Sequence, residues 1–120
     1  MKSFILTILL FAGLLNFTQK RPVIHDKNEV TKRTIADFEK AMTAPEGELY
    51  LFGQKNNISG SYSFKITVGN RGMVISVFVL NREGGTIKMQ NMLKDAVKDT
   101  RFSFKLPHNK KYTVKYTFKF

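Results

Sequence analysis

The sequence predicts an α+β fold, in which a small antiparallel sheet of two hairpins carries two helices on one face. Three observations lead to this prediction. Residues 25–48 and 86–100 repeat apolar side chains at steps of three and four, the period of an amphipathic helix. Residues 62–68 and 112–120 alternate apolar and polar side chains, as half-buried strands do. Turn residues separate these segments, so the predicted order is helix, strand, strand, helix, strand, strand.

The first eighteen residues have the layout of an export signal. Lys2 leads into an apolar run, residues 4–15, that is shorter than the roughly 20 residues a membrane helix needs. A retained membrane anchor is the alternative. We therefore divide the chain into a signal peptide or anchor at 1–18, a helical segment at 19–48 and an α+β domain at 49–120. A periplasmic or secreted protein is expected.

The helix within residues 25–48 has clear ends. Asp26 or Asn28 can accept hydrogen bonds from its first turn, and Pro45 with Gly47 stops it. Its apolar stripe is narrow but wide enough to lie on a sheet. The stripe consists of Val30, Thr34, Phe38, Ala41 and Met42.

A hairpin is predicted next. A short apolar run at residues 49–52 precedes the alternating strand of residues 62–68. The sequence "GNRG" at residues 69–72 is a turn, because glycine and asparagine tolerate positive φ. Residues 73–81 are apolar on both faces, which predicts a central strand covered on more than one side.

The second half of the chain predicts a helix and a second hairpin. In the helix of residues 86–100, one face carries Met89, Met92, Leu93, Ala96 and Val97. The first strand of the hairpin would bury Phe102, Phe104 and Leu106. A turn at residues 107–110 leads to the last strand, residues 112–120.

The residue types that catalysis and metal binding need are scarce. The chain has no cysteine, which excludes disulfides and cysteine-linked lipids, and its two histidines, His25 and His108, lie in predicted turns. The nine carboxylates are scattered. A hydrolytic pair or a metal site needs two or three such groups to converge. We therefore expect no enzyme, no cofactor and no metal site, and we expect both histidines at the surface.

Positive charge is the strongest signal in the composition. The net charge of +11 favours association with phosphate, anionic lipid or acidic protein surfaces. Alternation places Lys111, Lys115 and Lys119 on one face of the last strand, and Lys65 extends this stripe if the two strands are neighbours. The stripe is either the solvated side of a sheet or a binding face. Nucleic acid is not an expected partner, because the aromatic side chains of this strand lie on its opposite, buried face.

Three stretches follow one another from Gly60 onward and cover about half of the chain. They are "GSYSFKITVGNRGMVISVFVLN", "IKMQNMLKDAVKDTRF" and "YTVKYTFKF". In pattern and order they resemble the C-terminal domain of the TonB energy-transducer family. The resemblance implies a small sheet with helices on one face, whose last strand pairs with a short segment of an outer-membrane receptor. Physically, this is the addition of a strand to a sheet edge.

The chain also departs from that family. Transducing members carry a long Pro-rich spacer and usually a Tyr-Pro segment before the first strand, whereas residues 19–59 hold a predicted helix. A helix rises only about 1.5 Å per residue, so this segment is too short to transmit force across the periplasm.

Together these observations predict an exported, non-enzymatic binding domain of the bacterial envelope, which pairs a protein segment with its last strand. The exposed lysines would steer an acidic partner rather than specify it. The alternative is a secreted basic protein that binds an anionic surface, lipid or polysaccharide, by charge. The sequence leaves the oligomeric state open. The predicted partner-binding residues are Tyr112, Thr113, Val114, Lys115, Tyr116, Thr117, Phe118 and Lys119.

Overall fold

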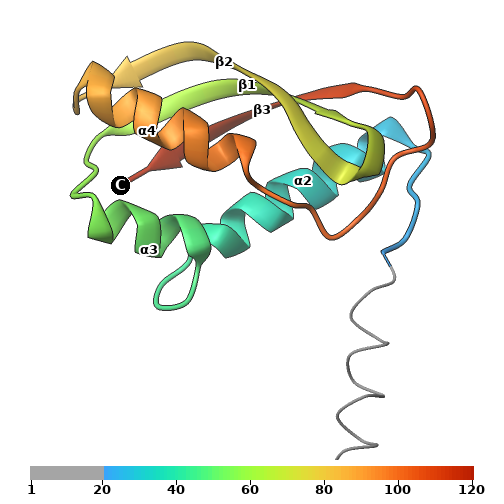
Figure 1. The fold of residues 1–120 in the computed structure, drawn as a ribbon, viewed down its shortest axis with the longest axis horizontal. Coiled ribbons are helices and arrows are strands. Elements are labelled where there is room, and N and C mark those ends of the chain that lie inside the picture. Colours follow the sequence, from blue (N-terminus) through green and yellow to red (C-terminus); the bar gives the residue numbers. More distant parts are fainter. Residues whose placement is uncertain (1–20) are drawn as a thin grey trace, which may run out of the picture.

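The computed structural model describes residues 21–120, so the predicted export signal lies outside the described residues. The fold is α+β, as the sequence predicts, with a three-stranded antiparallel sheet (Figure 1). The described chain has three α-helices instead of the predicted two, and one hairpin instead of two. The elements are α2 (Lys27–Ala41), α3 (Glu48–Lys55), β1 (Ser61–Gly69), the 3-10 turn η1 (Asn70–Gly72), β2 (Met73–Glu83), α4 (Ile87–Lys98) and β3 (Tyr112–Lys119).

The two predicted helices form close to their expected bounds, and side chains cap both. The Asp26 carboxylate accepts a hydrogen bond from the N–H of Glu29 at 3.0 Å, which confirms the predicted start of α2. The Thr86 hydroxyl does the same for the N–H of Met89 at 3.1 Å in α4. Such caps satisfy main-chain donors that have no partner within the helix.

The sheet has the strand order β2-β1-β3, and both outer strands run antiparallel to β1. The predicted hairpin of β1 and β2 is confirmed, with Arg71 (φ 66°) and Gly72 (φ 65°) turning the chain between them. The prediction that residues 73–81 form a central strand is wrong. β2 is an edge strand, because β3 occupies the other side of β1. An apolar run shows only that neither face is polar, and it does not show that both faces are covered.

The second predicted hairpin is also wrong in its pairing. Phe102, Phe104 and Leu106 are buried, as their alternation predicts, yet they form no strand. Their segment makes isolated main-chain contacts instead, such as the hydrogen bond from the Phe102 N–H to the Gly72 carbonyl at 3.2 Å. The last strand pairs with β1, which offers nine residues to its eight and a matching apolar face.

Helix α3 was not predicted, although the apolar run of residues 49–52 lies within it. The helix has only eight residues, and Leu49 and Gly53, four positions apart, are its buried positions. Such a short helix gives few repeats of the helical period, which is why local pattern does not separate it from a short strand.

The core is rich in aromatic rings that come from distant parts of the chain. The ring of Phe38 in α2 lies 5.3 Å from that of Phe102 and 5.1 Å from that of Phe118 in β3, both edge to face. Helix α4 lies against β2, and α2 lies against β3 (Figure 1). The even-numbered apolar residues of β1, from Tyr62 to Val68, are completely buried in the same core.

Thr34 is the one polar side chain buried in the described core, and its hydroxyl makes no hydrogen bond there. A buried hydroxyl without a partner costs about 1–3 kcal/mol relative to an apolar group of the same shape. We expect Thr34→Val to raise the free energy of unfolding by about 1 kcal/mol, as measured by urea denaturation. The control is Thr31→Val, because the exposed Thr31 hydroxyl donates to the Lys27 carbonyl. A loss of stability in Thr34→Val would show that the buried hydroxyl has a partner in solution.

Candidate functional site at the outer edge of β3

β3 is the more regular of the two edges of the sheet. It pairs with β1 in one uninterrupted register, from Ser61 opposite Lys119 to Val68 opposite Tyr112. Among residues 21–120, no strand pairs with its other side. The register of β2, at the opposite edge, shifts twice, and such bulges make an edge harder to extend. β3 is therefore the edge that an added strand fits better.

Alternate residues of β3 direct their main-chain groups toward β1 and toward the outer edge. The N–H of Phe120, just after β3, donates to the carbonyl of Gly60 at 3.0 Å. The two-residue period then places the other even-numbered residues toward β1 as well. The residues whose N–H and C=O groups face the outer edge are Thr113, Lys115, Thr117 and Lys119.

The eight predicted partner-binding residues divide into two groups. Val114 and Phe118 are buried and Tyr112 and Tyr116 are half-buried, so these side chains belong to the core side of the strand. The other four side chains are exposed on the opposite face. A partner strand at this edge would meet the outward main chain and the exposed side chains of the same four residues, Thr113, Lys115, Thr117 and Lys119.

The predicted lysine stripe does extend onto β1. Lys65 lies directly opposite Lys115, and the next pair on this face, Ser63 and Thr117, share a hydrogen bond of 2.8 Å between their hydroxyls. Two like charges directly opposite each other weaken a sheet slightly. A carboxylate placed next to both lysines would relieve this repulsion.

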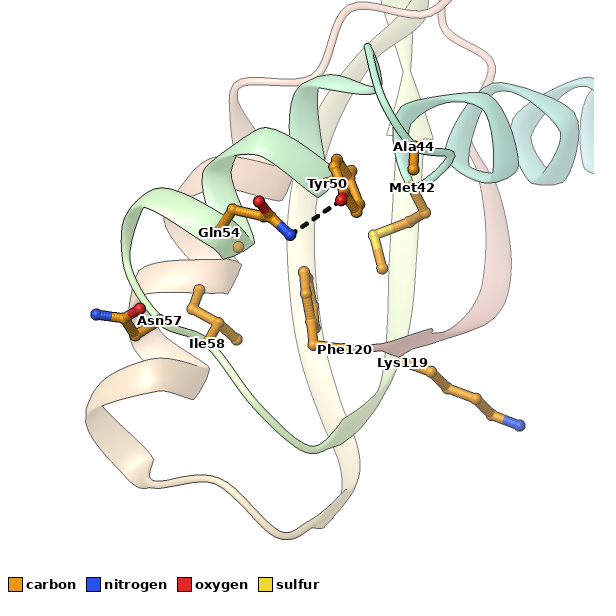
Figure 2. Close-up of a pocket in the computed structure, with 9 residues that line it drawn as sticks. Met42, Ala44, Tyr50, Gln54, Asn57, Ile58, Lys119 and Phe120 are labelled. Atoms are coloured by element: carbon orange, nitrogen blue, oxygen red, sulfur yellow. Dashed lines mark hydrogen bonds between the residues drawn. The ribbon is translucent and has the colours of Figure 1, made fainter.

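A pocket of about 720 Å³ opens where β3 ends. Figure 2 shows the ring of Phe120 directed toward Tyr50 and Gln54 of α3, while the side chain of Lys119 points away. The Gln54 amide donates to the Tyr50 hydroxyl at 2.9 Å. A methyl group on Gly53 would lie 2.5 Å from the Phe120 ring, so the glycine allows the ring to approach α3 closely. The pocket was not predicted from the sequence, because α3 was not.

The phenol of Tyr116 lies between α2 and β3. Burial raises its pKa above the ordinary value, and the negative charge of Glu39 raises the pKa further. The ring of Tyr116 is 5.3 Å from that of Phe38 and 4.7 Å from that of Phe118. The neutral Tyr116 ring packs β3 against α2, and its phenol provides no acid or base at neutral pH.

The described residues hold no cluster of potential metal ligands. Within residues 21–120, no three acidic or histidine side chains lie close enough to hold a metal ion. His25 and His108 are exposed, as predicted. The same part of the chain contains no helix with the length and apolar character needed to cross a membrane.

Comparison with known proteins adds no relative. No family model, no curated protein and no solved structure matches this chain. The resemblance to the TonB C-terminal domain therefore rests on the pattern and order of the elements alone, and it stays a prediction.

Proposed function

We propose that this chain is an exported, non-enzymatic binding domain of the bacterial envelope, which adds a partner's extended segment to the outer edge of β3. The observation that carries the proposal is the regular, unpaired outer edge of β3, with main-chain groups of four alternate residues directed outward. In strand addition, main-chain hydrogen bonds supply the affinity and alternate side chains supply the selectivity.

The partner segment is expected to be acidic. The side chains of Lys115 and Lys119 are exposed, and the main-chain groups of the same two residues face the outer edge where a partner would pair. Carboxylates on the partner would speed its encounter with these lysines and set the register of pairing. Lysines also discourage edge-to-edge aggregation of the domain itself, so one set of residues would serve both purposes.

The TonB-like order of elements supports an envelope protein as the partner, and an outer-membrane receptor segment is the first candidate. The departures from that family remain part of the proposal. Residues 27–55 hold α2 and α3 where transducing members have a Pro-rich spacer, so the proposed role is to capture or position the partner instead of transmitting force.

Strand pairing predicts a specific effect of proline at Thr117. Its N–H faces the outer edge, so Thr117→Pro removes a donor that a partner would use but no main-chain hydrogen bond to β1. The probe is a displayed library of extended peptides about ten residues long, enough to span β3. We expect Thr117→Pro to weaken the selected peptides tenfold or more, since one main-chain hydrogen bond is lost and its partner is left unpaired.

The matched control is Thr117→Val. Both variants lose the hydroxyl that bonds to Ser63, but valine keeps the outward N–H. Amide hydrogen exchange then locates the peptide, because pairing should slow exchange at Thr113, Lys115, Thr117 and Lys119. Peptides that bind both variants equally, or that leave these four amides unprotected, would show that β3 is not the pairing edge.

Steering by charge predicts a smaller effect at Lys115. Lys115→Glu should leave the fold intact and weaken an acidic peptide by roughly fivefold, mainly through slower association. Lys98→Glu in α4 makes the same charge change at an exposed site outside β3. Titration calorimetry measures the affinity of the two variants and the parent for the peptide, and stopped-flow mixing measures their association rates, each at low and at physiological salt. Equal binding by Lys115→Glu and the parent would exclude the steering role, and complete loss of parent binding with salt would exclude strand pairing as the main source of affinity.

A further inference from the structure

The face of the sheet opposite the core, here called the open face, carries two kinds of exposed side chain. It is the face of the odd-numbered residues of β1, since the even-numbered ones are buried. The register places Lys115 and Phe78 on it, on either side of Lys65. It also places Met73 there, opposite Gly69.

Three large apolar side chains of β2 are exposed on the open face, and they form what we call the apolar strip. Met73 is 41% exposed, Ile75 is 49% exposed and Phe78 is 62% exposed. Ile75 lies over Gly69, where a methyl group would collide with its side chain. These residues belong to the apolar run of residues 73–81, which the sequence predicts to be covered on more than one side. Contiguous apolar patches on a soluble surface often mark a binding site.

Basic side chains stand beside the apolar strip. Lys65, Lys115 and Lys119 project from β1 and β3, while Glu83 at one end is the acidic residue on the three strands. The ammonium group of Lys65 lies 5.4 Å from the centre of the Phe78 ring, so cationic and apolar groups are in direct contact. One face of the sheet thus combines a positive charge excess with apolar side chains.

We propose that the open face binds the surface of an anionic lipid bilayer, independently of strand pairing at the edge of β3. The lysines would lie at the level of the lipid phosphates, and the apolar strip would enter the interface beneath them. Charge complementarity selects this occupant. A second copy of the open face would bring the same positive excess against the first, and a polysaccharide would leave Met73 and Ile75 without apolar contacts.

The absence of cysteine permits a test with single labels on the full chain. Phe78→Cys carries an environment-sensitive fluorophore on the apolar strip. Ile87→Cys carries it on α4, at a side chain that is equally exposed, at 63%, but off the sheet. The probe is a vesicle of phosphatidylcholine with or without phosphatidylglycerol. We expect emission from position 78 to shift to shorter wavelength with the anionic vesicles only, and emission from position 87 to stay unchanged.

Charge reversal tests the lysine contribution. Lys65→Glu, in the Phe78→Cys chain, should raise the lipid concentration needed for half of the shift about tenfold, whereas Lys98→Glu in α4 should change it less than twofold. Thr117→Pro should leave the shift intact, which separates this surface from the pairing edge. All compared chains share the apolar run of residues 4–15, so a difference between them reports on the substituted or labelled position.

Three results would overturn the proposal. Equal shifts at positions 78 and 87 would mean that the open face is not what contacts the bilayer. A shift at position 78 that grows with protein concentration in the absence of vesicles would assign the apolar strip to a second copy of the chain. A shift with anionic polysaccharide but not with vesicles would assign the positive charge to that class of ligand.

Discussion

Phe118→Asp is expected to abolish folding. Phe118 is completely buried, and its ring lies 5.1 Å from Phe38, 5.7 Å from Phe64 and 4.7 Å from Tyr116. Removing a buried phenylalanine side chain costs about 3–5 kcal/mol, and a carboxyl group without a partner in the same place adds a further desolvation cost. Domains of this size are stable by about 5–15 kcal/mol, so the two costs together consume most of that stability.

Phe78→Asp is the matched control for this substitution. Phe78 is the same residue type in the same sheet, but it is 62% exposed and lies on the open face. Its replacement should change the free energy of unfolding by less than about 1 kcal/mol. Near-ultraviolet circular dichroism and urea unfolding compare the two variants. A folded Phe118→Asp chain, or an unfolded Phe78→Asp chain, would show that the open face packs against the core and that the face with Phe118 is exposed.

Gly72→Ala is expected to destabilise the protein by about 2–4 kcal/mol. Gly72 is the last residue of the hairpin turn and has φ of 65°, a left-handed conformation that costs alanine about 1–2 kcal/mol. An added methyl group would also collide with the carbonyl oxygen of Phe104, which is main chain and cannot rotate away. The Gly72 carbonyl accepts the hydrogen bond from Phe102, so this collision would disturb the whole segment after α4.

Gly84→Ala distinguishes the backbone cost of a left-handed alanine from the cost of the steric collision. Gly84 has φ of 73°, but a methyl group there would come no closer than 3.5 Å to another residue. Only the backbone cost remains, so we expect a loss of about 1–2 kcal/mol in the free energy of unfolding. Urea unfolding of both variants measures the difference. Equal losses at the two glycines would show that the segment of Phe104 moves aside at little cost.

Local patterns in the sequence were sufficient for the elements that depend on neighbouring residues. The cap at Asp26, the face of α2 with Val30 and Phe38, and the turn at Gly72 depend on residues a few positions apart. Alternation also identified Phe102, Phe104 and Leu106 as buried, because it records which side chains avoid water. It did not show that this segment forms no strand, because strand formation requires a partner main chain that alternation does not identify.

By itself, the sequence determined the α+β class, the core side of β1 and β3 and the scarcity of catalytic groups, all of which follow from residue type and local period. Only the tertiary structure decided that β3 pairs with β1, which left the outer edge of β3 unpaired among the described residues and placed β2 at the other edge. The exposure of Phe78 and the pocket at Phe120 follow from that strand order and from the unpredicted α3. Strand order depends on contacts between residues about 50 positions apart, such as Ser63 and Thr117, and no local period records them.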